Sequence, residues 1–140
     1  MKFIRLFSVV LSFALSASSF SQWISAGSVT NAGTFPSISV YGQDGIVIAG
    51  GPSGTAKVFK STNGGALFTD ISGDLPAGKE LFCVWAVDAN TIYVGDGGAA
   101  GGAGGDAKVY KTTNGGTAWV QIMNTGGTAG FFNSIVFSKS

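Results

Sequence analysis

Carboxylates are the residues of this sequence best suited to acid–base chemistry. Asp74, Glu80 and Asp96 lie near turn-forming residues, and two carboxyl groups flanking a glycosidic bond are enough to hydrolyse it. No spacing among them singles out a pair, and the sequence contains no histidine, no activated nucleophile and no metal-binding cluster that can be recognised. We therefore expect solvated loop charges on a protein that is not an enzyme and needs no cofactor or metal.

A glycine-rich stretch contains a second candidate for chemistry. DGGAAGGAGGDA, Asp96 to Ala107, holds one G-G-x-G-x-D at Gly101 to Asp106, which resembles a calcium-binding nonapeptide repeat. A single copy lacks the stacked neighbours that complete such a site, and Lys108 stands where that repeat has a large apolar residue. We interpret the stretch as a flexible loop and predict no metal site in it.

The clearest pattern is a repeat: KVFKSTNGGALFTDI at Lys57 to Ile71 returns as KVYKTTNGGTAWVQI at Lys108 to Ile122. Asn-Gly pairs tolerate the positive φ of a tight hairpin turn, while hydroxyl and amide side chains can bond to main-chain groups that the turn leaves unpaired. We therefore predict that both boxes are structural turns. Their residues are Ser61, Asn63, Gly65 and Phe68 in the first copy, and Thr112, Asn114, Gly116 and Trp119 in the second.

Both boxes resemble the Asp-box of bacterial neuraminidase-type (BNR) repeats, S-x-D-x-G-x-x-W, with asparagine in the aspartate position. The wording K-[ST]-T-N-G-G-x-x-W is similar to that of secreted propellers related to the photosystem II assembly factor and to sortilin. The resemblance implies a β-propeller in which the boxes lie away from the ligand. Sialidases of this kind hold a carboxylate with several arginines. Here Arg5, in the leader, is the single arginine, so a sialidase complete within these residues is excluded.

The elements that would position these turns are short strands. In the second copy they are LFCVWAV, apolar throughout and expected to be covered on both faces, then TIYVGD, KVYKTT and TAWVQIM. KVYKTT has the mixed pattern of a more exposed strand. Repeats of 47 residues (Phe35 to Phe82) to 51 residues (Lys57 to Lys108) with four antiparallel strands each are typical of propeller blades.

The phase of the repeat sets the predicted domain boundaries. Phe35, Ser37, Ile38 and Val40 align with Phe82, Val84, Trp85 and Val87, and a third copy begins at Phe132. We expect an all-β chain with two complete blades at 35–81 and 82–131, a last strand of a partial blade at 22–34 and the first strand of the next at 132–140. Closed rings have four or more blades, so this is an open arc. We favour an N-terminal fragment of a longer protein, the alternative being self-association through uncovered blade faces.

Residues 1–21 have the pattern of a cleavable signal peptide, with Lys2 and Arg5 before an apolar centre that is too short to span a bilayer comfortably. We expect a secreted, cell-surface or periplasmic protein without membrane insertion. After cleavage, six lysines face seven acidic residues, which gives no electrostatic reason to expect nucleic acid. Cys83 is the single cysteine, predicted to be a core thiol, with an intermolecular disulfide or a reactive thiol as alternatives.

These inferences favour an exported, non-catalytic propeller module for binding or scaffolding, with an unidentified protein or glycan ligand. Two alternatives remain: a carbohydrate-active propeller with its catalytic residues outside this chain, and an assembly factor like that of the photosystem. Ligands of propellers lie on loops joining second to third and fourth to first strands. In those loops the candidate binding residues are Asp74, Lys79, Glu80, Asp96 and Asp106.

Overall fold

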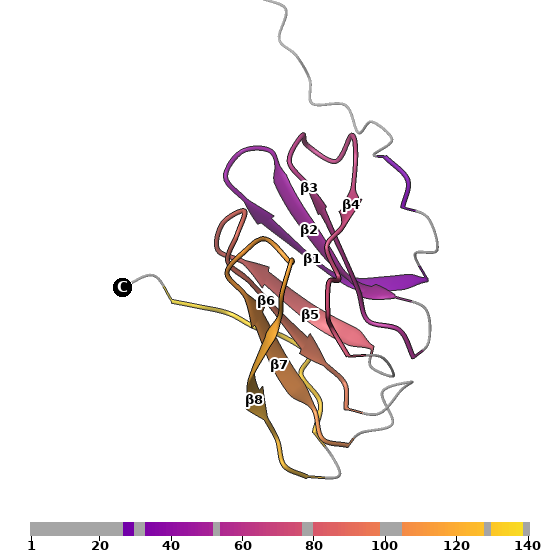
Figure 1. Cartoon of the computed structure of the whole chain (residues 1–140), viewed down its shortest axis with the longest axis vertical. Coiled ribbons are helices and arrows are strands. Elements are labelled where there is room, and N and C mark those ends of the chain that lie inside the picture. The colour runs from indigo at the N-terminus through magenta and orange to yellow at the C-terminus, as the bar shows by residue number, and fades with distance from the viewer. Residues whose placement is uncertain are drawn as a thin grey trace, which may run out of the picture.

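The computed structural model describes residues 27–29, 33–51, 54–76, 80–98, 105–127 and 130–138. They form an all-β structure of two four-stranded antiparallel sheets, with no helix in these ranges. Sheet A has the order β1-β2-β3-β4 and sheet B the order β5-β6-β7-β8, and the two lie side by side (Figure 1). The strands are β1 (Thr34–Tyr41), β2 (Gly45–Gly51), β3 (Lys57–Ser61), β4 (Thr69–Asp70), β5 (Leu81–Ala86), β6 (Ile92–Asp96), β7 (Lys108–Thr112) and β8 (Val120–Asn124).

The four-strand order within each repeat is confirmed, but the prediction of a more exposed third strand was wrong. Val109, Tyr110 and Thr112 of β7 are all buried, as are their counterparts in β3. The lysines of these strands are half-buried and keep a polar end free for contacts while their aliphatic stems cover apolar surface. A pattern that alternates charge and apolar residues therefore belongs here to an interior strand.

The two sheets pack front to back. Strand register makes their residues correspond, because Ile46 pairs with Ser61 in sheet A as Ile92 pairs with Thr112 in sheet B. Side chains of a strand alternate between the two faces of its sheet. The back face of sheet A carries Ser37, Ser39, Val47, Ala49 and Val58; the front face of sheet B, which packs on it, carries Val84, Ala86, Ile92, Val94 and Tyr110.

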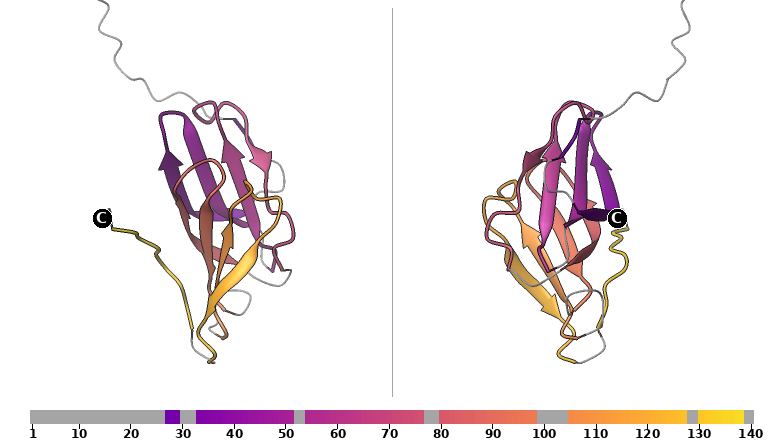
Figure 2. Two further views of the ribbon diagram at one scale, coloured as in Figure 1. Left: turned by 60° about the vertical axis from the view of Figure 1, so that its left-hand side comes forward. Right: turned by 90° about the vertical axis from the view of Figure 1, so that its right-hand side faces the viewer.

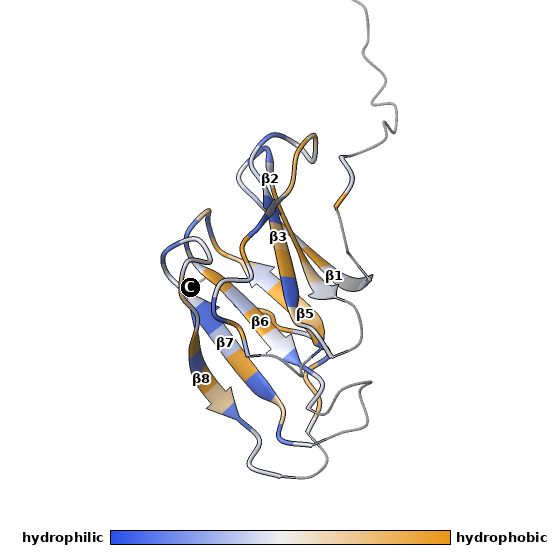
Figure 3. Ribbon diagram, turned by 45° about the vertical axis from the view of Figure 1, so that its right-hand side comes forward, coloured by the Kyte–Doolittle hydropathy of each residue, from blue (hydrophilic) through white to orange (hydrophobic). Residues whose placement is uncertain are grey.

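Opposite faces of equivalent sheets thus meet, which is how structural repeats stack. The counterparts of the sheet B front residues lie on the front face of sheet A, away from sheet B: Ile38, Val40, Ile46, Ile48 and Phe59. Of these, Ile38 and Val40 are 66% and 68% exposed. Figure 3 shows that orange, apolar positions occur on strands of both sheets. The same kind of face is therefore buried in sheet B and partly open in sheet A.

The register corrects the sequence alignment of the first strands by one residue. Val40 pairs with Ile46, and Ala86 pairs with Ile92, so Val40 corresponds to Ala86 and not to Val87. A shift of one residue moves every side chain of a strand to the other face. Ser37 accordingly points toward sheet B.

Serine side chains of β1 cap the neighbouring edge of sheet B. The N–H of Val84 donates to Ser37 Oγ at 2.9 Å, and the N–H of Ala86 donates to Ser39 Oγ at 3.0 Å. β5 is an edge strand, and these two N–H groups point away from its partner β6. Without the serines they would be free to pair with another chain. Hydroxyl groups therefore join the two sheets along their first strands.

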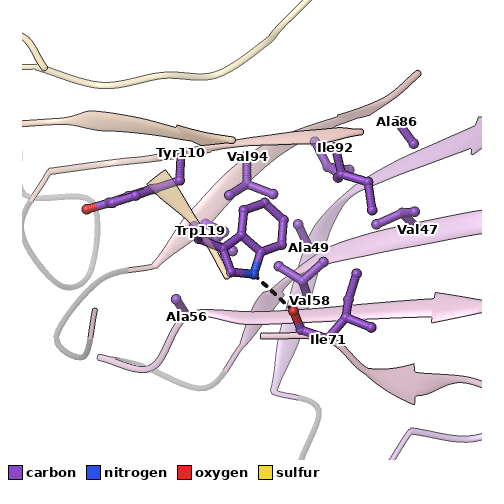
Figure 4. Packing of buried hydrophobic residues seen from close by; sticks show 12 residues of the cluster. Val47, Ala49, Ala56, Val58, Ile71, Ala86, Ile92, Val94, Tyr110 and Trp119 are labelled. Atoms are coloured by element: carbon purple, nitrogen blue, oxygen red, sulfur yellow. Dashed lines mark hydrogen bonds between the residues drawn. The ribbon is translucent and has the colours of Figure 1, made fainter. Parts of the chain in front are cut away.

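The core lies between the sheets and is closed by Trp119 from the beginning of β8. Its ring lies among Val58, Val94 and Tyr110, and its Nε1–H donates to the main-chain oxygen of Ile71 at 3.0 Å (Figure 4). Burying the indole while satisfying its N–H gives the full benefit of its apolar area. One residue of sheet B thus both fills the core and bonds to sheet A.

The chain before β1 contacts the first box. The N–H of Gly27 donates to Gly65 O at 2.6 Å, and a Cβ at Gly27 would lie 2.5 Å from Ala66 O. Gly73, which follows β4, packs in the same way against the second box, where a Cβ would lie 2.4 Å from Gly116 O. Residues 27–29 therefore hold, relative to sheet A, the place that the segment after β4 holds relative to sheet B.

The chain after β8 returns along the back face of sheet B, where residues 130–138 run as an extended trace (Figure 2). They have no strand partner among the described residues, so the strand predicted at 132–140 is not formed there. The predicted signal peptide at 1–21 lies outside the described residues. No helix in the described ranges is long and apolar enough to cross a membrane.

Candidate functional site

Two ends of the sheets must be considered separately, the end with the boxes and the end with the carboxylates. Box 1 comprises Ser61–Phe68 and box 2 comprises Thr112–Trp119. In box 1 the Ser61 hydroxyl accepts from the N–H of Gly65 at 2.9 Å and of Asn63 at 3.3 Å, and donates to Asn63 Oδ1 at 2.9 Å. Asn63 Oδ1 also accepts from the N–H of Leu67 at 3.0 Å.

Box 2 repeats these four hydrogen bonds. The Thr112 hydroxyl accepts from Gly116 and Asn114 at 3.0 and 3.3 Å and donates to Asn114 Oδ1 at 2.8 Å, which accepts from Ala118 at 3.0 Å. Both hydroxyl-bearing residues are 1% exposed. In each box the hydroxyl and the asparagine Oδ1 are therefore bonded within the turn itself. Using them in catalysis would break these hydrogen bonds and open the turn.

The glycines, rather than the asparagines, supply the positive φ of the turn. Gly64 and Gly65 have φ of 67° and 90°, and Gly115 and Gly116 have φ of 73° and 96°. The asparagine instead uses its side-chain oxygen as an acceptor, which explains how it can stand where an aspartate would serve equally. The sequence predicted positive φ for the Asn-Gly pair, whereas the structure has it at the two glycines, one residue later.

Loops at the opposite end of the sheets, called the loop end below, hold three of the predicted binding residues: Glu80, Asp96 and Asp106. Glu80 connects the two sheets there, because its Oε1 accepts from the N–H of Gly54 at 3.2 Å and its main-chain oxygen accepts from Gly97 at 3.2 Å. It is half-buried. Glu80 therefore belongs to the structure of this end as well as to its accessible surface.

Asp96 is the buried member of the group, with 0% exposure at the end of β6. Its Oδ1 accepts from the N–H of Lys108 at 2.8 Å and of Gly98 at 3.0 Å, and so fixes the beginning of β7. Its Oδ2 has no hydrogen-bond partner. An unsatisfied buried oxygen costs about 1–3 kcal/mol, so Asp96 lowers the stability of sheet B at the end of β6.

The charge of Asp96 affects two neighbouring side chains that could otherwise lose a proton. Burial, together with the negative charges of Asp96 and Asp106, raises the pKa of Tyr110 to about 12. Burial likewise raises the pKa of the Cys83 thiol to about 11, with a hydrogen bond from Gly95 opposing it and Asp96 adding to it. Cys83 is 2% exposed, which confirms the predicted core thiol. Both groups are therefore protonated at neutral pH.

Asp106 lies in the loop before β7 and is partly exposed. Its Oδ2 is 3.2 Å from Lys108 Nζ, and its Oδ1 accepts from the N–H of Gly126 at 3.1 Å. The same loop is held by Gly130, whose N–H donates to Gly105 O at 2.8 Å. Asp106 thus joins the loop before β7 to the loop after β8.

Asp74 is placed apart from this group. Its Oδ1 accepts from the N–H of Trp119 at 2.7 Å, so it holds box 2 against the segment that follows β4. Lys79 lies outside the described residues. The structure therefore brings together Glu80, Asp96 and Asp106, and it adds Tyr110, which sequence reasoning had placed on an exposed strand and for that reason missed.

Two half-buried carboxylates, Glu80 and Asp106, lie at this end near the buried Asp96 and Tyr110. Carboxylate oxygens are hydrogen-bond acceptors, so their accessible parts can receive N–H or O–H donors. Among the described residues no group of three or more histidine, cysteine, aspartate or glutamate side chains is placed to hold a metal ion. Comparison with known proteins shows that no family model, no curated protein and no solved structure matches this chain.

Proposed function

We propose that this chain is an exported, non-catalytic β-propeller module that binds or scaffolds a protein or glycan ligand at the loop end of its sheets. The observation that carries the proposal is the front-to-back packing of two equivalent four-stranded sheets, each closed by the same box. Such stacking can continue in one direction, as blades do. The resemblance of the boxes to the Asp-box supports the same architecture, here as an open arc.

The loop end is the better candidate for the ligand because its loops carry accessible carboxylates on a rigid support. At the box end, the hydroxyl and asparagine Oδ1 atoms of both boxes are used to close the turns. Binding residues commonly lie on loops that a rigid scaffold positions. Glu80 and Asp106 are the accessible side chains, whereas Asp96 acts from beneath by fixing the main chain around them.

A binding experiment with matched variants tests the location of the ligand. The purified protein is applied to a glycan array and to immobilised extracellular proteins, and the affinity for any ligand found is measured by titration calorimetry. We expect Glu80→Gln combined with Asp106→Asn to weaken binding at least about tenfold, since each lost charge-assisted hydrogen bond contributes ~1.5–3 kcal/mol. Asp44→Asn, an exposed change at the box end, serves as the control.

Two outcomes would contradict the proposal. Equal loss of affinity in the control variant would place the ligand elsewhere, and release of a sugar product during the assay would put the chain in the carbohydrate-active class. Export is tested separately: the mass of the protein recovered from the medium or periplasm should correspond to a chain that begins at Gln22.

A further inference from the structure

The back face of sheet B carries a groove that no other described segment fills. It has a volume of about 510 Å³. Its floor is formed by Tyr93, Val109, Ile122 and Met123 of β6, β7 and β8, and its wall by the chain from Phe132 to Phe137. Ile122 and Met123 are 50% and 53% exposed, so the floor offers apolar surface to an occupant.

The wall of the groove is held against sheet B by aromatic contacts. Phe137 lies against Tyr93 with ring centroids 4.7 Å apart and against Trp85 at 6.2 Å, and Phe131 lies against Phe82 at 4.6 Å. The N–H of Phe132 donates to Asp96 O at 3.1 Å. From 133 to 138 the main chain makes no hydrogen bond with other described residues. The wall is thus an extended segment beside the groove whose main chain from 133 to 138 is unpaired among the described residues.

The interface between the sheets shows what such a groove receives. On the back face of sheet A, Val47 and Val58 share one buried cluster with Ile92 and Val94 of β6, the second strand of sheet B (Figure 4). Register makes Tyr93 the counterpart of Val47, and Val109 the counterpart of Val58. Both counterparts lie in the groove, and the segment 132–138 lies over sheet B as the first strand β5 lies over sheet A. The vacant position beside it therefore corresponds to that of a second strand.

Lys111, on the back face of sheet B, is the counterpart of Lys60, whose side chain bridges sheets A and B. Lys60 Nζ reaches from sheet A to the turns of sheet B, donating to Ala89 O at 2.9 Å and Gly115 O at 3.3 Å. Its equivalent Lys111 instead lies over the Tyr93 ring, with Nζ 5.3 Å from the centroid. Lys111 is therefore positioned to donate to the main chain of an occupant.

We propose that this groove binds a β-strand of another polypeptide, which pairs with the edge of residues 132–138 and inserts alternate β-branched side chains between Tyr93, Val109 and Ile122. Main-chain bonds would give affinity and the alternate side chains specificity, as in other cases of strand addition. Among the described residues, β2 and β6 of a second copy are each paired on both sides and cannot add to this edge. Its edge strands β1, β4, β5 and β8 could, so a second copy is one outcome that the test below distinguishes. The proposal does not depend on the ligand of the loop end.

The probe is a fluorescent peptide with the sequence of Ala89–Gly97, which contains the β6 strand itself, and binding is followed by anisotropy. We expect saturable binding that falls at least tenfold when Ile122→Asp is introduced in the protein. Leu67→Asp is the control, since Leu67 is 66% exposed, lies in box 1 and does not line the groove. A peptide in which Ile92 and Val94 are both replaced by aspartate should also bind at least tenfold more weakly.

Two further peptides separate strand addition from simple apolar contact. One is N-methylated at Ile92 and Val94 and the other at Tyr93 and Gly95, so that each loses the donors of one edge only. Strand addition predicts that one of the two loses binding and the other keeps it. Equal binding of both, or equal weakening by Leu67→Asp and Ile122→Asp, would overturn the proposal. So would a dimer in sedimentation that Ile122→Asp dissociates and the peptide does not displace, since a second copy would then be the occupant.

Discussion

The two boxes have the same internal hydrogen bonds but different surroundings. Box 1 ends in Phe68, which is half-buried, whereas box 2 ends in Trp119, which is 7% exposed and bonded to both Ile71 and Asp74 of sheet A. The comparison separates two roles that one motif combines. The polar residues close the turn locally, and the terminal aromatic residue joins neighbouring units wherever a unit lies in front of it.

The largest difference between the boxes should appear when the aromatic residues are removed. Trp119→Ala should lower the free energy of unfolding by ~3–5 kcal/mol because it opens a cavity in the core. Phe68→Ala should cost at most about 1.5 kcal/mol, since much of that ring is already in water. Urea unfolding followed by circular dichroism measures both.

Trp119→Phe keeps this prediction testable if the alanine variant does not fold. It preserves most of the ring and removes mainly the bond from Nε1 to Ile71 O, so we expect a cost of about 1 kcal/mol from the lost hydrogen bond in addition to the smaller ring. Equal costs at Phe68 and Trp119 would show that the aromatic residue serves its own box and not the interface between the sheets.

The hydroxyl groups should instead behave alike in the two boxes. Ser61→Ala and Thr112→Val each leave two main-chain N–H groups and one asparagine oxygen short of a partner. Each change should therefore cost ~1–3 kcal/mol in urea unfolding. The exposed neighbours provide controls, with Thr62→Val and Thr113→Val expected to change stability by less than about 0.5 kcal/mol. A cost confined to one box would mean that the turn depends on its neighbours after all.

Features that depend on local sequence could be predicted, and those that depend on contacts between the units could not. The turn of each box depends on eight consecutive residues, so it could be predicted from local sequence. The return of the box in a second copy then indicated four strands per unit. The orientation of β1 could not, because matching Phe35 with Phe82 sets an offset of 47 residues, whereas strand pairing matches Val40 with Ala86, an offset of 46 residues. The burial of β3 was missed because Lys60 reaches carbonyl groups of the other sheet.

The loop end shows the same limit. Glu80, Asp96 and Asp106 could be selected because they follow strands or lie in glycine-rich loops, but their proximity depends on how the two sheets align. Asp74 has the same residue type and a similar loop context, yet it serves the main chain of Trp119. Only the three-dimensional position shows that Asp74 supports box 2, whereas Glu80 and Asp106 lie at the opposite end of the sheets.

The smallest expected difference between the units concerns a surface ion pair present in the first. Lys57 Nζ lies 2.6 Å from Asp70 Oδ2, and the main-chain N–H of Ser72 donates to Asp70 Oδ1 at 2.8 Å. Partial burial raises the pKa of Asp70, but the bonds from Lys57 and Ser72 outweigh it and hold the pKa below its ordinary value. A depressed carboxyl pKa stabilises the fold above the pKa of the unfolded chain and loses that contribution as pH falls through the folded value.

Asp70→Asn should therefore lower stability at pH 7 by less than about 1 kcal/mol, because the pair is largely exposed, and should have still less effect near pH 2. The second unit has Gln121 in place of Asp70, and its Lys108 is already 3.2 Å from Asp106 Oδ2. Gln121→Asp should consequently gain less than Asp70→Asn loses, since the new carboxylate must compete for a lysine in use. Urea midpoints of both variants at pH 2, 4 and 7 measure this. If Gln121→Asp raises stability as much as Asp70→Asn lowers it, Lys108 pairs with the new carboxylate in preference to Asp106. Asp106 would then be held mainly by the N–H of Gly126.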